Sequence, residues 1–202
     1  SGDHKAVNKM HQMSFLIYNL VIFPIIAGML IVNDDFVRFF LGKDFQDARY
    51  AIAIMIFRMF FIGWTNIMGI QILIPHDKNK EFMLSTTIPA IVSVGLNVLF
   101  LPHFGFIGAA IVSVLTESLV WLIQLYYTRH YLKEVPIIGS MTKIMFASAV
   151  MYGLLLLVRP FLHFTPTLNV LVYAVLGGII YLIAILSLRV VDVKELKQIF
   201  KK

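Results

Sequence analysis

Two charged side chains, Arg58 and Glu117, lie well inside long apolar stretches of this sequence. Arg58 stands eight residues beyond Tyr50, where its stretch begins, and Glu117 stands eleven residues beyond Phe106. If these stretches cross a membrane, each charge costs about 2.5 kcal/mol or more, so it usually pairs, becomes neutral or lines a water-filled path. The two residues are therefore the first candidates for a functional site.

Arg58 is suited to binding a phosphate, because its planar fork of donors matches two oxygens and stays charged. With about 100° per helical residue, Thr65 and Gly69 share its face and Asn66 flanks it. The alternative is that Arg58 extends to the nearer membrane surface, since it lies only about 12 Å along the helix from Tyr50. The sequence leaves both interpretations open.

Glu117 is near the middle of its stretch, and a neutral, hydrogen-bonded structural carboxyl is the preferred interpretation. The alternative is a place in a substrate or proton path. Asn97 belongs to a small and polar face of the preceding stretch, which we expect to contact protein or a cavity. The predicted substrate-path residues are Arg58, Thr65, Asn66, Asn97 and Glu117.

The sequence gives little indication of an enzyme active site. The histidines all fall in predicted tails or connections, so we expect no buried imidazole base at membrane depth. There is no cysteine, no zinc-type ligand cluster and no glycine-rich phosphate loop. We therefore predict no catalytic residue, no cofactor and no metal site.

Six apolar stretches occupy most of the 202 residues, and each approaches the roughly 20 residues that a spanning helix needs. They run over residues 14–32, 50–74, 82–101, 106–127, 141–158 and 168–188. With 59% hydrophobic and 14% charged residues, the chain is not a soluble domain, and its net charge of +6 does not indicate nucleic-acid binding. The predicted fold is an all-α membrane bundle of six transmembrane helices.

Basic residues between the stretches fall mainly on alternate sides. One side holds Lys5, Lys9, Lys78, Lys80, Arg129, Lys133, Lys143, Arg189, Lys194, Lys197, Lys201 and Lys202. The other side holds Arg38, Lys43, Arg49 and Arg159, partly offset by aspartates. Because Lys and Arg accumulate in cytoplasmic loops, this pattern places both termini in the cytoplasm.

The two ends of the chain carry further predictions. It starts at Ser1 with a polar lead-in that is typical of a connection inside a longer protein, so we expect a carboxyl-terminal fragment. After Arg189, the spacing of Val193, Leu196 and Phe200 predicts a short basic amphipathic helix on the membrane surface.

Several ordered motifs resemble the carboxyl half of the oligosaccharide (Wzx-type) flippases in the MATE-like (MOP) exporter superfamily. They are residues 23–28, 39–45, 69–75 and, most strongly, 96–110 followed by Thr116 and Glu117. The resemblance covers about residues 1–134, which it implies are a four-helix part of the carboxyl-terminal transporter lobe. Residues 135–202 match only in hydropathy and are predicted to be a final pair of helices with a basic tail.

The resemblance implies a transporter that moves undecaprenyl-pyrophosphate-linked oligosaccharide repeat units across a bacterial cytoplasmic membrane for surface polysaccharide synthesis. Its partners would be the bilayer, the lipid-linked oligosaccharide and the missing amino-terminal lobe of the same protein. Alternatives are a cation-coupled exporter or a peptidoglycan lipid-precursor flippase of the same superfamily. A membrane-embedded glycan-modifying enzyme or a structural helper subunit fits less well.

Overall fold

The computed structural model describes residues 2–133, 135–162 and 164–190, and this part of the chain is helical throughout its regular structure. The long helices are α1 (Gly2–Phe40), α2 (Ala48–Asn66), α3 (Asn79–Leu132), α4 (Ile138–Val158) and α5 (Pro166–Ser187). Short helical elements connect them, namely η1 (Lys43–Phe45), η2 (Ile67–Leu73), η3 (Ile74–His76) and η4 (Arg159–Phe161). Over the described ranges, five helices are long and apolar enough to cross a membrane. The predicted helical membrane bundle is confirmed.

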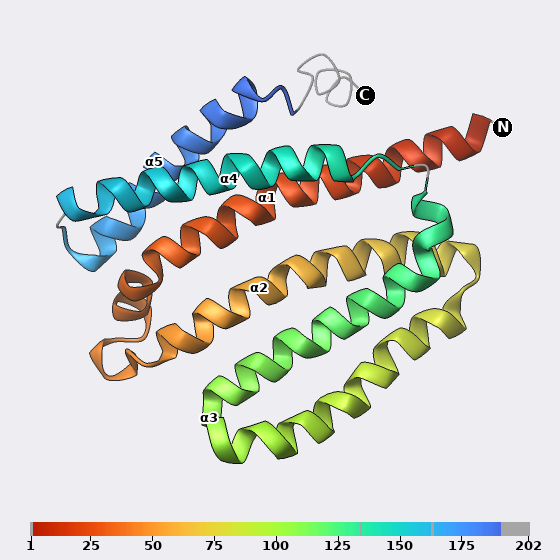
Figure 1. Ribbon diagram of the computed structural model, residues 1–202, viewed down its shortest axis with the longest axis horizontal. Helices are drawn as coiled ribbons and strands as arrows, with labels where there is room; N and C mark the ends of the chain where they lie inside the picture. Colours follow the sequence, from red (N-terminus) through yellow and green to blue (C-terminus); the bar gives the residue numbers. More distant parts are fainter. Residues whose placement is uncertain (1, 134, 163, 191–202) are drawn as a thin grey trace.

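Helix α3 contains two of the predicted spans. Its backbone leaves the helical region at Gly105, where φ is 54° and ψ is −137°, and the chain reverses there (Figure 1). A positive φ is readily adopted by glycine, which explains why the turn is at this residue. We call residues 79–104 the first arm of α3 and residues 106–132 its second arm. Each arm is long enough to span the hydrocarbon core.

The helices form a row with α4 and α5 at one edge, followed by α1, α2, the second arm of α3 and, at the other edge, the first arm of α3 (Figure 1). Helix α1 packs against α2, α4 and α5, and α2 packs against α3. The largest apolar cluster joins α1, α4 and α5 around Ile31, Ile144 and Met151. A second cluster surrounds Phe15, Trp64 and Met68. The division of the chain at residue 134 into two domains stays a prediction.

Helix α1 is longer than the sequence predicted. The polar lead-in that carries Lys5 and Lys9 is helical, and the helix continues past residue 32 to Phe40. Pro24 lies inside α1 without ending it. A proline removes one backbone hydrogen bond, and in membrane helices this loss is tolerated where neighbouring helices pack on both sides. The predicted tail helix falls mainly on residues 191–202, outside the described residues.

The predicted span over residues 50–74 is helical but not uniform. Residues Ile67–Leu73 form the π-helix η2, which continues α2. A Cβ atom on Gly69 would lie 2.5 Å from the Phe82 ring and 3.2 Å from Nε2 of Gln124. The absence of a side chain at Gly69 therefore lets η2 approach both arms of α3. π-helical turns inside longer helices often occur at functional positions.

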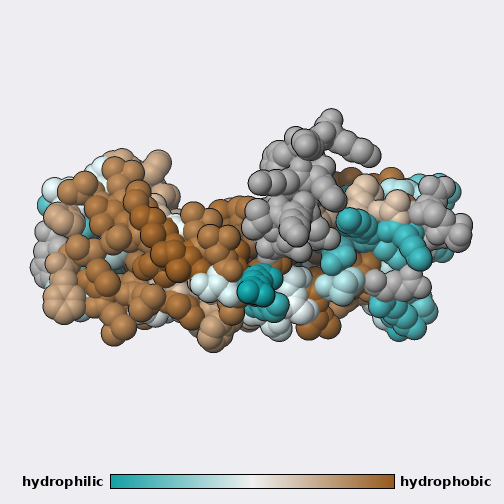
Figure 2. All heavy atoms as spheres, turned by 90° about the horizontal axis from the view of Figure 1, so that it is seen from above, coloured by the Kyte–Doolittle hydropathy of each residue, from teal (hydrophilic) through white to brown (hydrophobic). Residues whose placement is uncertain are grey.

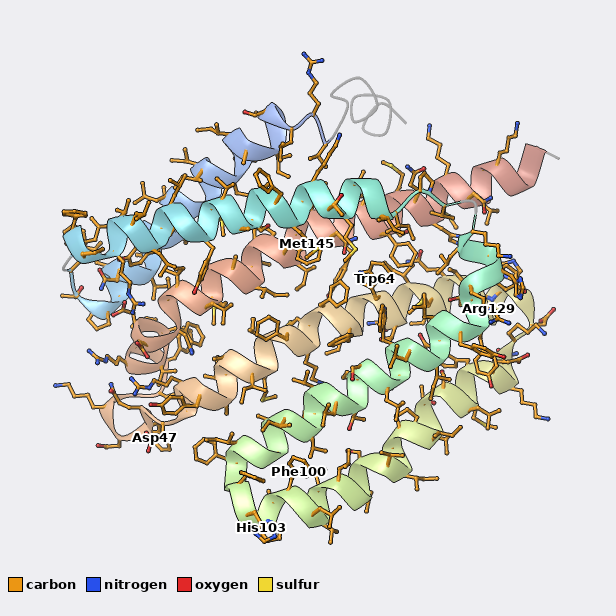
Figure 3. The ribbon with its side chains drawn as sticks, in the orientation of Figure 1. Asp47, Trp64, Phe100, His103, Arg129 and Met145 are labelled. Atoms are coloured by element: carbon orange, nitrogen blue, oxygen red, sulfur yellow. The ribbon has the colours of Figure 1, made fainter. Side chains whose placement is uncertain are left out.

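Hydrophilic residues gather toward one end of the bundle on the face that Figure 2 shows, whereas the opposite end of this face is mainly hydrophobic. Figure 3 places Arg129 at the end where α2 passes into α3, and Asp47 and His103 at the opposite end. The two sides of the charge pattern therefore correspond to two ends of the bundle. Which end faces the cytoplasm stays a prediction from the excess of Lys and Arg.

Candidate functional site

The two charged residues inside the predicted spans contact each other. Arg58 on α2 donates from Nη2 to Oε1 of Glu117 at 2.7 Å and from Nε to the same oxygen at 3.3 Å. Glu117 lies on the second arm of α3, so this ion pair joins two neighbouring helices. The two residues are 59 positions apart in the sequence, and the structure brings them together.

The Arg58–Glu117 ion pair is partly accessible to solvent or to a ligand. The side chain of Arg58 is 37% exposed and that of Glu117 is 19% exposed. Arg58 uses two of its three nitrogens, and no other described residue forms a hydrogen bond with Nη1 or with Oε2 of Glu117. A guanidinium with a free donor can still accept an oxyanion. The geometry thus allows an anion to compete with Glu117 for Arg58.

The other predicted site residues do not join this pair. The hydroxyl of Thr65 donates to the Ile62 carbonyl at 2.9 Å, within its own helix. The amide of Asn97 donates to the Ser93 carbonyl at 2.9 Å, again within its own arm. Asn66 is exposed on α2. Among the described residues, only Arg58 and Glu117 of the five are brought into contact.

An apolar groove lies beside Arg58, where α4 faces α1, α2 and the second arm of α3. Its volume is about 650 Å³. Its walls are aromatic, aliphatic and methionine side chains, and Ser148 and Tyr152 contribute the hydroxyl groups; the walls include Phe57, Phe60, Phe61, Met141, Met145 and Tyr152. Ser148 is buried, and its Oγ has no hydrogen-bond partner among the described residues. Phe57 and Phe61 flank Arg58 along α2, so the groove and the ion pair are adjacent.

The prediction that the histidines all lie in tails or connections is wrong for His11. This side chain is 2% exposed within α1, and its Nε2 donates to the backbone oxygen of Gln71 in η2 at 3.2 Å. Because α1 begins at Gly2, His11 lies inside the helix and not in a polar tail. Its spacing of four residues from buried Phe15 and eight from buried Asn19 was the signal that could have revealed its burial.

At the other end of the bundle, two carboxylates near the end of α1 contact neighbouring elements. Asp34 forms ion pairs with Arg49 at 3.4 Å and with Arg159 at 3.6 Å. Asp35 accepts a hydrogen bond from Asn169 at 3.2 Å. These contacts tie α1 to α2, η4 and α5. The aspartates of the first connection therefore do more than offset its positive charge.

Sequence comparisons place this chain near other membrane proteins. It is 23% identical over 210 residues to an uncharacterised membrane protein of Methanocaldococcus jannaschii, and the match covers all of this chain and 39% of that protein. It is 26% identical over 130 residues to a "Putative O-antigen transporter" of Escherichia coli K12, which covers 62% of this chain and 31% of that protein. No family model and no solved structure matches.

These similarities agree with a multi-pass membrane protein and indicate a transporter-like chain. The chain spans only about a third to two fifths of the length of these relatives. The matches therefore leave long regions of both relatives uncovered. The comparisons are compatible with a role other than enzyme catalysis, because one relative is named as a transporter.

Proposed function

We propose that this chain is part of a flippase of the Wzx type, which moves undecaprenyl-pyrophosphate-linked oligosaccharides across the cytoplasmic membrane of a bacterium. The observation that carries the proposal is the partly exposed Arg58–Glu117 ion pair, which joins two neighbouring helices beside an apolar groove. A lipid diphosphate has both an anionic group and a hydrocarbon chain. The pair and the groove offer one surface for each.

In this proposal, Arg58 binds the pyrophosphate and Glu117 neutralises Arg58 when no substrate is present. An unpaired guanidinium at membrane depth would be costly, so a resident carboxylate keeps the empty transporter stable. The incoming diphosphate replaces one anionic partner with another. The methionine and aromatic side chains of the groove are adaptable apolar surfaces suited to a flexible hydrocarbon chain.

Thr65, Asn66 and Asn97 keep the role that the sequence assigned them, as polar residues along the path of the sugar. Asn66 is exposed on α2 and Asn97 is half-buried on the first arm of α3. Both are therefore accessible to further helices of a longer protein. Such helices, together with the bilayer and the lipid-linked oligosaccharide, are the partners that the proposal requires.

The same pair weighs against a cation-coupled exporter. Such a protein needs a buried carboxylate that is free to bind the coupling cation. Glu117 is the carboxylate at membrane depth, and Arg58 already occupies one of its oxygens at 2.7 Å. A cation would have to displace a guanidinium, whereas an anion needs only to replace a carboxylate. A peptidoglycan lipid-precursor flippase would use the same anion chemistry and differs only in the sugar.

The test is complementation of surface polysaccharide in a flippase-deleted strain, with the substitutions made in the full-length protein. Arg58→Lys keeps the charge but loses the paired donors, so polysaccharide should fall partially, and Arg58→Ala should reduce it further. Glu117→Gln keeps a hydrogen-bonding side chain and should be tolerated. Arg38→Ala is the matched control, because Arg38 is an exposed arginine at the end of α1.

Polysaccharide is normalised to the amount of protein in the membrane. Full polysaccharide from the Arg58→Ala variant at an unchanged protein level would refute the phosphate role. A fall of the same size in the Arg38→Ala variant would show a general requirement for positive charge and would equally remove the support for Arg58.

A further inference from the structure

A second pocket lies at the end of the bundle where α2 passes into α3. It has a volume of about 420 Å³. The connection and the start of α3 contribute Leu73, Lys78 and Glu81, and the end of the second arm contributes Tyr127, His130 and Tyr131; these residues line the pocket. Arg129, next in sequence to His130, marks this end of the molecule in Figure 3. The pocket is therefore formed by both ends of α3.

The walls of this pocket are held in place. Leu73 is fully buried. The ring of Tyr131 contacts the ring of His76, with the two centroids 4.2 Å apart. His76 is in turn fixed by a 2.7 Å hydrogen bond from its Nδ1 to the carbonyl oxygen of Ile72. Tyr131 therefore packs against the connection between α2 and α3.

The pocket presents one cation, one carboxylate and two phenol groups. Lys78 forms an ion pair with Glu81, with 3.1 Å between Nζ and Oε1. The hydrogen bond to Glu81 raises the pKa of Lys78, so the ammonium stays charged. One of its three N–H groups is used in this contact, and the others can bind a second acceptor. The phenol groups of Tyr127 and Tyr131 can donate to the same acceptor.

The position of the pocket indicates where its ligand comes from. It lies at the lysine-rich end of the helices, next to tyrosines at the end of α3, and tyrosine is enriched at membrane surfaces. The adjoining side chains of the first arm, such as Met83 and Ile88, are apolar and exposed. A lipid whose chains lie along this arm would have its headgroup at the level of the pocket.

We propose that this pocket binds the phosphate of an anionic phospholipid, with Lys78 as the charged contact and Tyr127, His130 and Tyr131 as hydrogen-bonding partners. Lysine side chains near the membrane surface attract anionic headgroups. The shared chemistry is a phosphate oxyanion, which a soluble phosphate could also supply. The proposal commits to the lipid and does not depend on the transport function.

The experiment measures lipid binding to the purified chain in detergent by native mass spectrometry. The probe is phosphatidylglycerol, and phosphatidylcholine is the comparison lipid. Phosphatidylglycerol should bind more tightly, and Lys78→Gln should weaken its binding about fivefold, the effect typical of one lysine near a membrane surface. Glu81→Gln should strengthen binding, because it removes the carboxylate that competes for Lys78.

Lys143→Gln is the matched control, since it removes one exposed lysine near the start of α4, away from the pocket. Three results would overturn the proposal: equal binding of both lipids, equal losses for Lys78→Gln and Lys143→Gln, or weaker binding after Glu81→Gln. Inorganic phosphate is then added at millimolar concentration. Retention of phosphatidylglycerol supports the lipid as ligand, and its displacement assigns the pocket to soluble phosphate instead.

Discussion

Breaking the Arg58–Glu117 pair is the perturbation whose effect on stability the structure defines best. Arg58→Gln leaves the carboxylate of Glu117 without its partner, and Glu117→Gln leaves the guanidinium of Arg58 without its counter-charge. The double substitution removes both charges. If the pair contributes to the fold, the double variant should be more stable than the sum of the two single losses indicates.

The magnitude follows from the distance and the exposure of the two side chains. Two unit charges 2.7 Å apart attract by about 6 kcal/mol at an effective dielectric constant of 20. Solvent screening and lost side-chain entropy reduce this figure, because Arg58 is 37% and Glu117 19% exposed. Exposed pairs contribute about 0.2–1 kcal/mol, and loss of one partner of a buried pair costs about 3–5 kcal/mol. We expect a coupling energy of about 2 kcal/mol.

The assay is a double-mutant cycle on unfolding of the purified protein in detergent. For a chain of this length, a coupling of about 2 kcal/mol corresponds to a shift in Tm of about 4–8 °C. The control cycle uses Lys78 and Glu81, an i,i+3 pair near the start of α3. Because that pair is more exposed, its coupling should be much smaller than that of Arg58 and Glu117.

Two results would refute this reasoning. A coupling energy for Arg58 and Glu117 no larger than that of the control pair would mean that the contact does not hold α2 against α3. A double variant that loses as much stability as the two single variants together would mean that each side chain stabilises the fold through other contacts. In either case, the exchange of Glu117 for a substrate anion would lose its energetic basis.

Two further predictions concern packing and orientation. Gly69→Ala should lower Tm by several degrees, because the added Cβ would lie 2.5 Å from the Phe82 ring. Gly95→Ala is the control and should not destabilise the protein, because no atom lies within 4 Å of the added Cβ. Equal effects of the two substitutions in a thermal melt would contradict the close approach of η2 to α3. Single cysteines at Lys78 and Arg129 should be shielded from a membrane-impermeant thiol reagent in intact cells while one at Asp44 is labelled, and labelling at Lys78 would reverse the orientation.

Apolar length and charge spacing predicted the helical bundle and its reversals well. Residues 82–101 and 106–127 were separated in the sequence by proline and glycine, and Gly105 is where α3 reverses. These are local signals, because the conformation of a glycine and the length of an apolar run depend little on distant residues. The extent of α1 was missed because its lead-in is polar and lies outside the apolar run, although the helix begins at Gly2.

The candidate site was harder to predict, because it depends on which helices are neighbours. Arg58 and Glu117 are 59 residues apart, and their contact requires α2 to pack on the second arm of α3 in one register. In the sequence, Arg58 and Glu117 are two separate charges without an assigned partner, and each has a second interpretation that needs no substrate. Similarly, the sequence places His11 in a polar tail. In the structure its ring contacts the backbone oxygen of Gln71 in the π-helix η2, which is 60 residues away in the chain.

The polar contacts between helices differ in how readily a ligand could replace them. His11 contacts the Gln71 backbone, Trp64 donates to Asn19 at 3.0 Å, and Gln124 donates to Ser85 at 3.2 Å, all among buried side chains. Losing such a neutral contact would leave a buried polar group unsatisfied, at a cost of about 1–3 kcal/mol.

The Arg58–Glu117 pair is different, because it is charged, partly exposed and placed along the length of the helices. The other ion pairs among the described residues lie at helix ends or in connections. An anion that reaches Arg58 can replace Glu117 without leaving the guanidinium unpaired, and the partly exposed carboxylate can be hydrated. If substrate binding changes a contact between α2 and α3, this pair is therefore the contact that can be exchanged at the lowest cost.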